Sequence, residues 1–309
     1  MIKVDQLCRK FGELYAVQDL SFHVRKGEVM GLLGPNGAGK STTMKMLTCF
    51  LPPSSGEASV GDVSLHDSIE VRRKVGYLPE NAPSYTDLDV RSHLKFIGRM
   101  YGLPNATITD RITEMTGVCG LEHVLHRRID ELSKGFRQRV GLAASMLHDP
   151  ACLIFDEPTT GLDPNQIIEI RHLIRRLGEK KTVLLSSHVL SEVEAVCDRM
   201  MIIDQGKLQV IGTSEELAHH TQGHSVFYVR FKESGEQVLD LLTQSFPDIQ
   251  IKPQDDQSNA YMLYHSEPDV PLAEKLFHTS VASGAIILEM QSKKKTLEDV
   301  FRELTGEGQ

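Results

Sequence analysis

The stretch GLLGPNGAGKSTT, residues 31–43, decides the fold of this chain. It matches the pattern G-x-x-x-x-G-K-[ST] and follows an apolar, strand-like run, as a glycine-rich loop between strand and helix should. The glycines let successive backbone N–H groups face one phosphate, the lysine neutralises the terminal phosphates, and the hydroxyl binds Mg²⁺. We therefore predict a nucleotide-binding phosphate loop, with Ser41 also a metal ligand. Its residues are Gly34, Pro35, Asn36, Gly37, Ala38, Gly39, Lys40, Ser41 and Thr42.

Two adjacent carboxylates follow a second apolar run. In ACLIFDEPTTGLDP, residues 151–164, four apolar residues are typical of a buried parallel strand that ends at Asp156 and Glu157. Because successive strand side chains point to opposite sides, the two carboxylates have different tasks. We predict that Asp156 contacts Mg²⁺ through its water shell and that Glu157 is the general base for an attacking water.

A third apolar run ends close to a histidine. The residues from Thr182 to Leu185 predict a strand, and His188 lies just beyond its carboxyl end. In open α/β sheets ligands bind at that edge, so we predict that His188 contacts the γ-phosphate of the nucleotide.

Taken together, these motifs resemble those of the nucleotide-binding subunits of ATP-binding cassette (ABC) transporters, over roughly residues 1–215. The resemblance implies an ATPase that dimerises head to tail around two ATP molecules and Mg²⁺. It also implies a separate integral membrane permease as partner. The stretches LSKGFRQRVGLAASMLHDP and GYLPE, and the C-terminal part of the chain, are similar to those of exporters in drug, polysaccharide or gliding-motility systems.

The stretch LSKGFRQRV resembles the signature motif of that family, which usually reads LSGGQ. Lys134 replaces the first glycine and Phe136 replaces the glutamine. A helix start with unpaired N–H groups suits an anion, although a solvated helix end would also explain this cluster. The resemblance implies that Ser133 and the N–H group of Gly135 bind a nucleotide held by the other subunit.

Three further positions follow from the resemblance. KFG resembles the loop whose aromatic ring stacks on adenine, which nominates Phe11, with Tyr15 as the alternative. TGLDP resembles the D-loop and nominates Asp163 for a contact across the dimer. In VGYLPE the family usually has glutamine where this chain has Glu80, which we predict to be a nucleotide and metal contact. An ionised Glu80 would bind Mg²⁺ better than an amide but repel phosphate oxygens, so its role stays open.

The fold class predicted is α/β, a P-loop NTPase core with an antiparallel β subdomain and an α-helical insert. The runs IKVDQL, LSFHV and EVMGLL predict an antiparallel edge before the phosphate loop, and MIIDQGKLQVIG predicts a hairpin at Gln205 and Gly206. Apolar spacing over about residues 88–150 is helical and predicts the insert that carries the signature. TSEE, residues 213–216, has the form of a capping box that begins the last helix of this domain.

The remaining residues predict a small C-terminal α+β domain. Their runs follow the order strand, helix, strand, strand, helix, strand, which is ferredoxin-like. AHHTQGHS before them predicts a linker, and TLEDVFRELTG predicts a final helix. We place the domains at residues 1–221 and 222–309. Regulation, dimerisation and stabilisation all remain open as roles of the second.

Composition narrows the function. The chain has 309 residues, a formal net charge of -8 and 40% hydrophobic residues. A chain with this negative net charge lacks the stripe of basic residues that nucleic acid binding needs, so no nucleic acid partner is expected. Five scattered cysteines indicate neither a disulfide framework nor a zinc site. No run is long enough for a membrane span and the start has no secretory pattern, so we expect a cytoplasmic protein, peripheral on the inner face of the membrane.

The function predicted is therefore an ATP-hydrolysing subunit that powers a separate permease for export of an unidentified substrate. The alternative is a soluble ABC-type ATPase acting on ribosomes or DNA, or a nucleotide-gated regulatory module. Soluble translation members usually join two cassettes in one chain, and DNA-repair members insert a long coiled coil. Neither pattern is found in this sequence.

Overall fold

The computed structural model describes residues 1–81, 84–220, 225–232, 236–247, 249–254, 257–265, 272–293 and 297–305. The chain divides into two compact units, Met1–Ser214 with Leu304–Gln309, and Glu215–Glu303. The boundary lies between residues 214 and 215, whereas the sequence placed it between residues 221 and 222. The two differ because helix α8 (Ser214–His220) belongs almost wholly to the second unit.

A six-stranded sheet forms the centre of the first unit, in the order β10-β9-β3-β8-β7-β6. All neighbours are parallel except β9 and β10, which pair antiparallel across the predicted turn at Gln205 and Gly206. The strands are β3 (Val29–Leu33), β6 (Val75–Leu78), β7 (Cys152–Phe155), β8 (Thr182–Ser187), β9 (Arg199–Asp204) and β10 (Lys207–Gly212). The carboxyl ends of β3, β7 and β8 therefore meet at one edge.

A second, antiparallel sheet has the order β2-β1-β4-β5. Its strands are β1 (Ile2–Phe11), β2 (Leu14–Val24), β4 (Ser55–Val60) and β5 (Val63–Ser64). The prediction that EVMGLL joins this antiparallel edge is wrong, because β3 lies between β8 and β9 in the parallel sheet. All five residues of β3 are buried, which is typical of a parallel strand covered on both faces.

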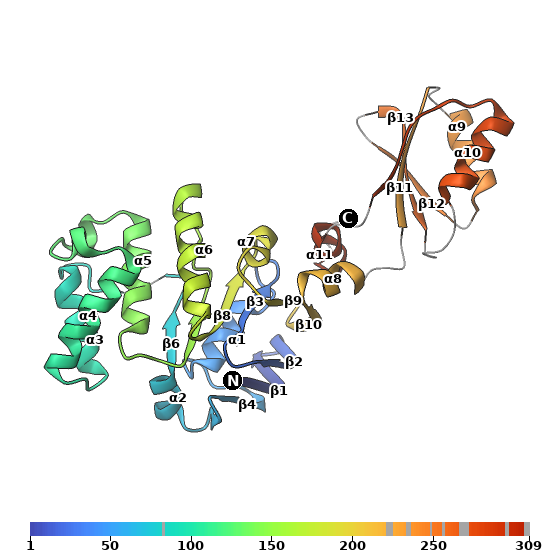
Figure 1. The fold of residues 1–309 in the computed structure, drawn as a ribbon. Coiled ribbons are helices and arrows are strands. Elements are labelled where there is room, and N and C mark those ends of the chain that lie inside the picture. The colour runs from blue at the N-terminus through green and yellow to red at the C-terminus, as the bar shows by residue number, and fades with distance from the viewer. Residues whose placement is uncertain are drawn as a thin grey trace. The chain divides into compact units, whose positions relative to one another are not determined.

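Helices cover the parallel sheet and form the predicted insert. In the core these are α1 (Lys40–Leu47), α2 (Ser68–Lys74), α6 (Pro164–Gly178) and α7 (Leu190–Glu194). The insert holds α3 (Val90–Met100), α4 (Asn105–Cys119) and α5 (Lys134–Met146), which lie together on one side of the core (Figure 1). Between residues 88 and 150, all of them described, the only extended pairing is a bridge between Asp89 and Arg128.

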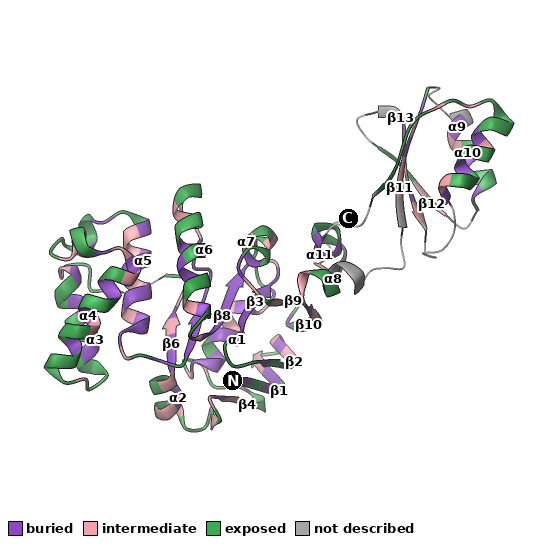
Figure 2. Ribbon diagram, viewed as in Figure 1, coloured by how far each residue is buried: buried purple, intermediate pink, exposed green. Residues whose placement is uncertain are grey.

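One buried cluster joins the two sheets of the first unit. It includes Met30 and Leu32 of β3, Met44 and Leu47 of α1, and Val60 of β4, all with no exposed surface. Figure 2 shows β3 and its neighbour β8 coloured largely as buried. The strand and helix on either side of the phosphate loop are thus both anchored in the core.

The second unit holds a four-stranded antiparallel sheet in the ferredoxin-like order β12-β13-β11-β14. Its elements are β11 (Ser225–Phe231), α9 (Glu236–Ser245), β12 (Gln250–Gln254), β13 (Gln257–His265), α10 (Leu272–Ser283) and β14 (Ile287–Lys293), followed by α11 (Leu297–Thr305). The predicted linker AHHTQGHS is only partly seen, because its first three residues end α8 and residues 221–224 lie outside the described part. None of the described helices is both long and apolar enough to cross a bilayer.

Candidate nucleotide-binding site

The phosphate loop joins β3 to α1 in a conformation that needs glycine. Gly37 and Gly39 have φ angles of 84° and 103°, in the left-handed region. A Cβ on Gly39 would lie 2.5 Å from the carbonyl oxygen of Ala16, and one on Gly34 would lie 2.3 Å from that of Ile203. The loop is therefore held close against its neighbours at the start of α1. There the unpaired N–H groups and the helix dipole favour an anion.

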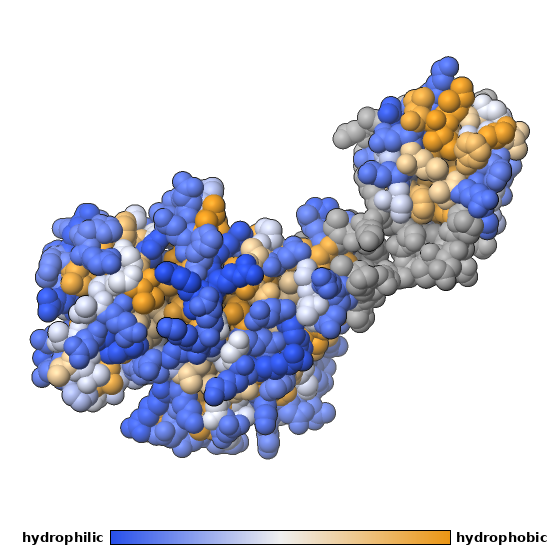
Figure 3. Space-filling view, in the orientation of Figure 1, coloured by the Kyte–Doolittle hydropathy of each residue, from blue (hydrophilic) through white to orange (hydrophobic). Residues whose placement is uncertain are grey.

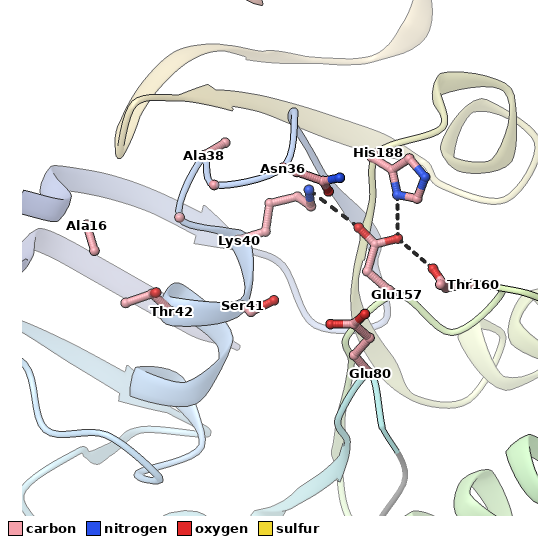
Figure 4. Close-up of a pocket in the computed structure, with 12 residues that line it drawn as sticks. Ala16, Asn36, Ala38, Lys40, Ser41, Thr42, Glu80, Glu157, Thr160 and His188 are labelled. Atoms are coloured by element: carbon pink, nitrogen blue, oxygen red, sulfur yellow. Dashed lines mark hydrogen bonds and ion pairs between the residues drawn. The ribbon is translucent and has the colours of Figure 1, made fainter.

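A cavity of about 340 Å³ opens beside the loop (Figure 4). Its lining brings together predicted residues from the phosphate loop, the segment after β6, and the ends of β7 and β8. The lining residues are Ala16, Asn36, Gly37, Ala38, Gly39, Lys40, Ser41, Thr42, Glu80, Glu157, Thr160 and His188.

Lys40 is buried at the inner wall of this cavity, with only 6% of its surface exposed. Its Nζ donates hydrogen bonds to the carbonyl oxygens of Gly34 (2.7 Å) and Pro35 (3.1 Å). The same nitrogen lies 3.4 Å from Oε1 of Glu157. The loop thus aims the ammonium group at the place where an anion would enter.

Glu157 is held from several sides. Its Oε2 accepts a hydrogen bond from the hydroxyl of Thr160 (3.0 Å) and lies 2.9 Å from Nδ1 of His188. Its N–H donates to Oγ of Ser186 (2.8 Å). The backbone φ of Glu157 is 50°, an uncommon value for a residue with a side chain. Strained backbone of this kind clusters at functional sites, and here it turns the carboxylate towards Lys40.

Asp156 and Ser41 form the second polar pair. Oδ1 of Asp156 accepts hydrogen bonds from Oγ of Ser41 (3.0 Å) and of Ser186 (2.8 Å), and the aspartate is 1% exposed. These hard oxygen donors, with Glu80 in the cavity that Ser41 also lines, fit Mg²⁺. In the described part of the chain, no three His, Cys, Asp or Glu side chains form a metal cluster. A few carboxylate and hydroxyl oxygens are the kind of donor set that Mg²⁺ uses when it also binds substrate phosphates.

The sequence reasoning missed Thr160 and Ser186. Thr160 follows Glu157 in the same quoted motif, so its hydroxyl was visible as a neighbour of the carboxylates. Ser186 lies near the end of β8, thirty residues after Asp156 in the sequence. Its Oγ is 2.8 Å from Oδ1 of Asp156. Its position at the same sheet edge as His188 was the available indication.

Phe11 and Tyr15 lie on the β1–β2 hairpin, 48% and 46% exposed. The guanidinium of Arg9 lies 4.6 Å from the ring centre of Phe11, and Nζ of Lys10 lies 5.3 Å from that of Tyr15. Neither ring lines the cavity, whereas the next residue, Ala16, does. The choice between the two rings as an adenine contact stays a prediction.

The signature and D-loop residues lie outside this cavity, at two helix starts. Oγ of Ser133 accepts a hydrogen bond from the N–H of Phe136 (3.3 Å) and caps α5. Asp163 likewise caps α6 by accepting from the N–H of Gln166 (3.0 Å). A Cβ on Gly135 would lie 2.5 Å from Cδ of Gln166, so the two helix starts are packed together.

A model of the ABC transporter family matches residues 17–160. The uncharacterized ABC transporter ATP-binding protein YxlF of Bacillus subtilis is 35% identical over 302 residues, which cover 97% of this chain and 98% of that protein. This chain belongs to the ABC transporter family. It is an ATP-binding subunit and an ATPase, so the nucleotide for its phosphate loop is ATP.

Two other comparisons extend this result. The linearmycin resistance ATP-binding protein LnrL of Bacillus subtilis is 31% identical over 310 residues, covering 99% of this chain and 98% of that protein. A solved dimeric cassette in a post-hydrolysis state, bound to ADP and Pi, has a TM-score of 0.63 at 24% identity. The matched region covers 69% of this ABC subunit and 98% of the solved chain. This likeness shows the shared fold.

Proposed function

We propose that this ABC subunit forms a head-to-tail homodimer around two ATP molecules and drives a separate membrane permease that exports a substrate. It would act at the cytoplasmic face of the membrane, where ATP is available. The observation that carries the proposal is the convergence of Lys40, Glu157 and His188 on one cavity, beside the Ser41–Asp156 pair.

In this proposal the reaction is phosphoryl transfer to water. Glu157 takes a proton from the attacking water, and Lys40 offsets the negative charge that develops on the γ-phosphate. His188 orients the Glu157 carboxylate through the 2.9 Å contact and faces the γ-phosphate. Ser41, Asp156 and Glu80 would hold Mg²⁺, which when bound neutralises phosphate charge.

The placement of the signature supports a composite site. Ser133, Gly135 and Asp163 lie at helix starts suited to anions, yet none of them lines the cavity of its own chain. In a two-fold dimer, the signature of each copy would reach the nucleotide cavity of the other copy. The solved relative that shares the fold is itself described as a dimer.

A groove beside the nucleotide cavity supports a membrane partner. It measures about 770 Å³ and lies between core and insert, where Phe50 and Met100 are 73% and 68% exposed. Exposed apolar surface of this kind marks docking sites. Pro79 and Asn81 line the groove, and Glu80 between them lines the nucleotide cavity. One short segment would thus report the state of the nucleotide to a docked permease.

The direction of transport is inferred from relatives. LnrL is a linearmycin resistance protein, and a matched protein of Bacillus licheniformis is a bacitracin transport ATP-binding protein. Resistance is readily explained by removal of the compound from the cell, so these names support export.

Two substitutions test the proposal. Lys40→Ala should weaken ATP binding, because the buried ammonium group is the main partner for the terminal phosphates. Glu157→Gln should keep ATP binding but slow hydrolysis by about 100-fold or more, as expected for loss of a general base. Nucleotide affinity and turnover should be measured for both variants. Hydrolysis by Glu157→Gln at the unaltered rate would refute the assignment of the base.

A further inference from the structure

The second unit has an open sheet edge beside exposed apolar side chains. β14 lies at the end of the sheet and, within the described residues, pairs only with β11. Its Leu288 and Met290 are 50% and 37% exposed, and α10, which contacts β14, exposes Phe277 and Val281. Figure 3 shows apolar side chains gathered on this unit. An unpaired edge next to apolar surface is a template for another strand.

The opposite edge of the same sheet is built differently. β12 has only five residues, includes Pro253, and exposes Gln250, Lys252 and Gln254. Proline has no N–H group to donate, and a lysine on an edge strand discourages pairing. β14 contains no proline, and its one lysine, Lys293, is the last residue of the strand. Of the two edges, β14 is therefore the one suited to accept a further strand.

Met290 shows where such a strand would extend the core. It lies opposite Val229 of β11, and directly opposed residues of an antiparallel pair share a face of the sheet. Val229 is buried in the cluster that also contains Leu242 of α9 and Leu276 of α10. Met290 therefore lies at the open margin of the helix-covered face, where a neighbouring strand would cover it.

We propose that β14 pairs antiparallel with β14 of a second copy of this chain, about a two-fold axis at Met290. This contact rests on the proposed ATP-bound dimer, because two copies in one assembly raise the effective concentration of the second strand. The accessory units would then hold the two subunits together when the nucleotide sites open.

The sequence of β14 is compatible with itself in this register. A two-fold axis at Met290 places that residue opposite its own copy and Glu289 opposite Gln291, on the part of β14 that pairs regularly with β11; the ladder is irregular only beyond Glu289, at Leu288. No like charges face each other across these pairs. An axis at Glu289 would instead oppose two carboxylates, which is unfavourable. The pairing is isologous and closes with two copies, so it does not propagate into fibres.

Cysteine cross-linking of the full-length protein tests the pairing. Met290→Cys should form a disulfide-linked homodimer under mild oxidation, because directly opposed strand residues lie within disulfide reach. Lys252→Cys on the other edge is the matched control, and unaltered protein controls for native cysteines. We expect at least fivefold more cross-linked dimer for Met290→Cys than for Lys252→Cys. Glu289→Cys and Gln291→Cys should cross-link only when the two variants are mixed, because these positions lie opposite each other in the regular part of the strand.

Sedimentation of the same samples, with ATP in a Glu157→Gln background, separates the two proposals. If the ATP-bound dimer forms but Met290→Cys cross-links no better than Lys252→Cys, the β14 pairing is wrong. Equal cross-linking at every position would show random collision and also refute it. Cross-linking in intact cells only to another protein would assign the edge to that partner instead. Loss of ATP-driven dimerisation alone, with the cross-link retained, would refute the proposed function and show that the β14 pairing forms without the ATP-bound dimer.

Discussion

At the scale of single residues, the site is organised around Glu157. A left-handed backbone at a residue with a side chain costs about 1–3 kcal/mol, so the surrounding contacts must hold it in place. Ser186 fixes its N–H group, while Thr160 and His188 fix its carboxylate. The phosphate loop could be predicted because it is one contiguous motif. For Ser186 only its place near a strand end could be predicted; its contacts with Asp156 and Glu157 could not, because they join segments distant in sequence.

We expect Ser186→Ala to lower ATP turnover about 10- to 100-fold, by analogy with partners that orient metal ligands. The change removes a hydrogen bond to Asp156 and leaves the N–H group of Glu157 without its partner. Ser187→Ala is the matched control, since that buried hydroxyl contacts Glu192 and the N–H of Val189 instead. Steady-state hydrolysis should separate the two variants, and equal losses would argue against an orienting role for Ser186.

Glu80 gives a second prediction at this scale. Glu80→Gln should leave ATP binding intact and change hydrolysis less than about tenfold, because an amide can still orient water and metal. The measurement is turnover at saturating ATP and Mg²⁺. A loss beyond about 100-fold, comparable to that of a catalytic base, would show that Glu80 itself carries the chemistry.

At the scale of elements, the contacts between the insert and the core were not predicted from the sequence. The helical spacing predicted α3, α4 and α5, but not how they meet the sheet. His148, after α5, stacks on Tyr101 with ring centres 3.8 Å apart, and its Nε2 lies 3.1 Å from the carbonyl oxygen of Val75 in β6. β3 was misplaced for a similar reason, because an apolar run alone does not say which sheet it joins.

His148 should make stability depend on pH. Burial lowers its pKa from 6.5 to about 4. In the unfolded chain His148 therefore binds a proton below about pH 6.5. In the folded chain its imidazole stays neutral down to about pH 4. Its contribution to stability is complete above pH 6.5 and falls as the pH drops towards 4, by roughly 1–3 kcal/mol.

His148→Phe keeps a ring for the stack but cannot titrate, so it should lose less stability than the unaltered protein between pH 7 and 4.5. Urea denaturation across this range is the measurement. His172→Phe, at an exposed position on α6, should leave the pH profile as it is. Identical profiles for His148→Phe and the unaltered protein would contradict the argument.

At the scale of the whole molecule, the central proposal is that each ATP is held by two chains. Lys40 lines the cavity of its own chain, and Ser133 does not. The family and the fold could be predicted from local motifs in the sequence. The composite site could be suggested only by resemblance, because no local pattern shows which chain a helix start faces.

A mixed dimer tests this proposal most directly. One subunit carries Lys40→Ala and the other Ser133→Arg, both in a Glu157→Gln background so that hydrolysis does not empty the pockets. The heterodimer is purified through two different tags, and retained ATP is counted by filtration beside both homodimers. Composite sites put both lesions in one pocket and leave the other intact, so we predict about one ATP per heterodimer and little in either homodimer. Retention in the heterodimer no better than in the homodimers would contradict the account, because it would mean that each chain builds its own site.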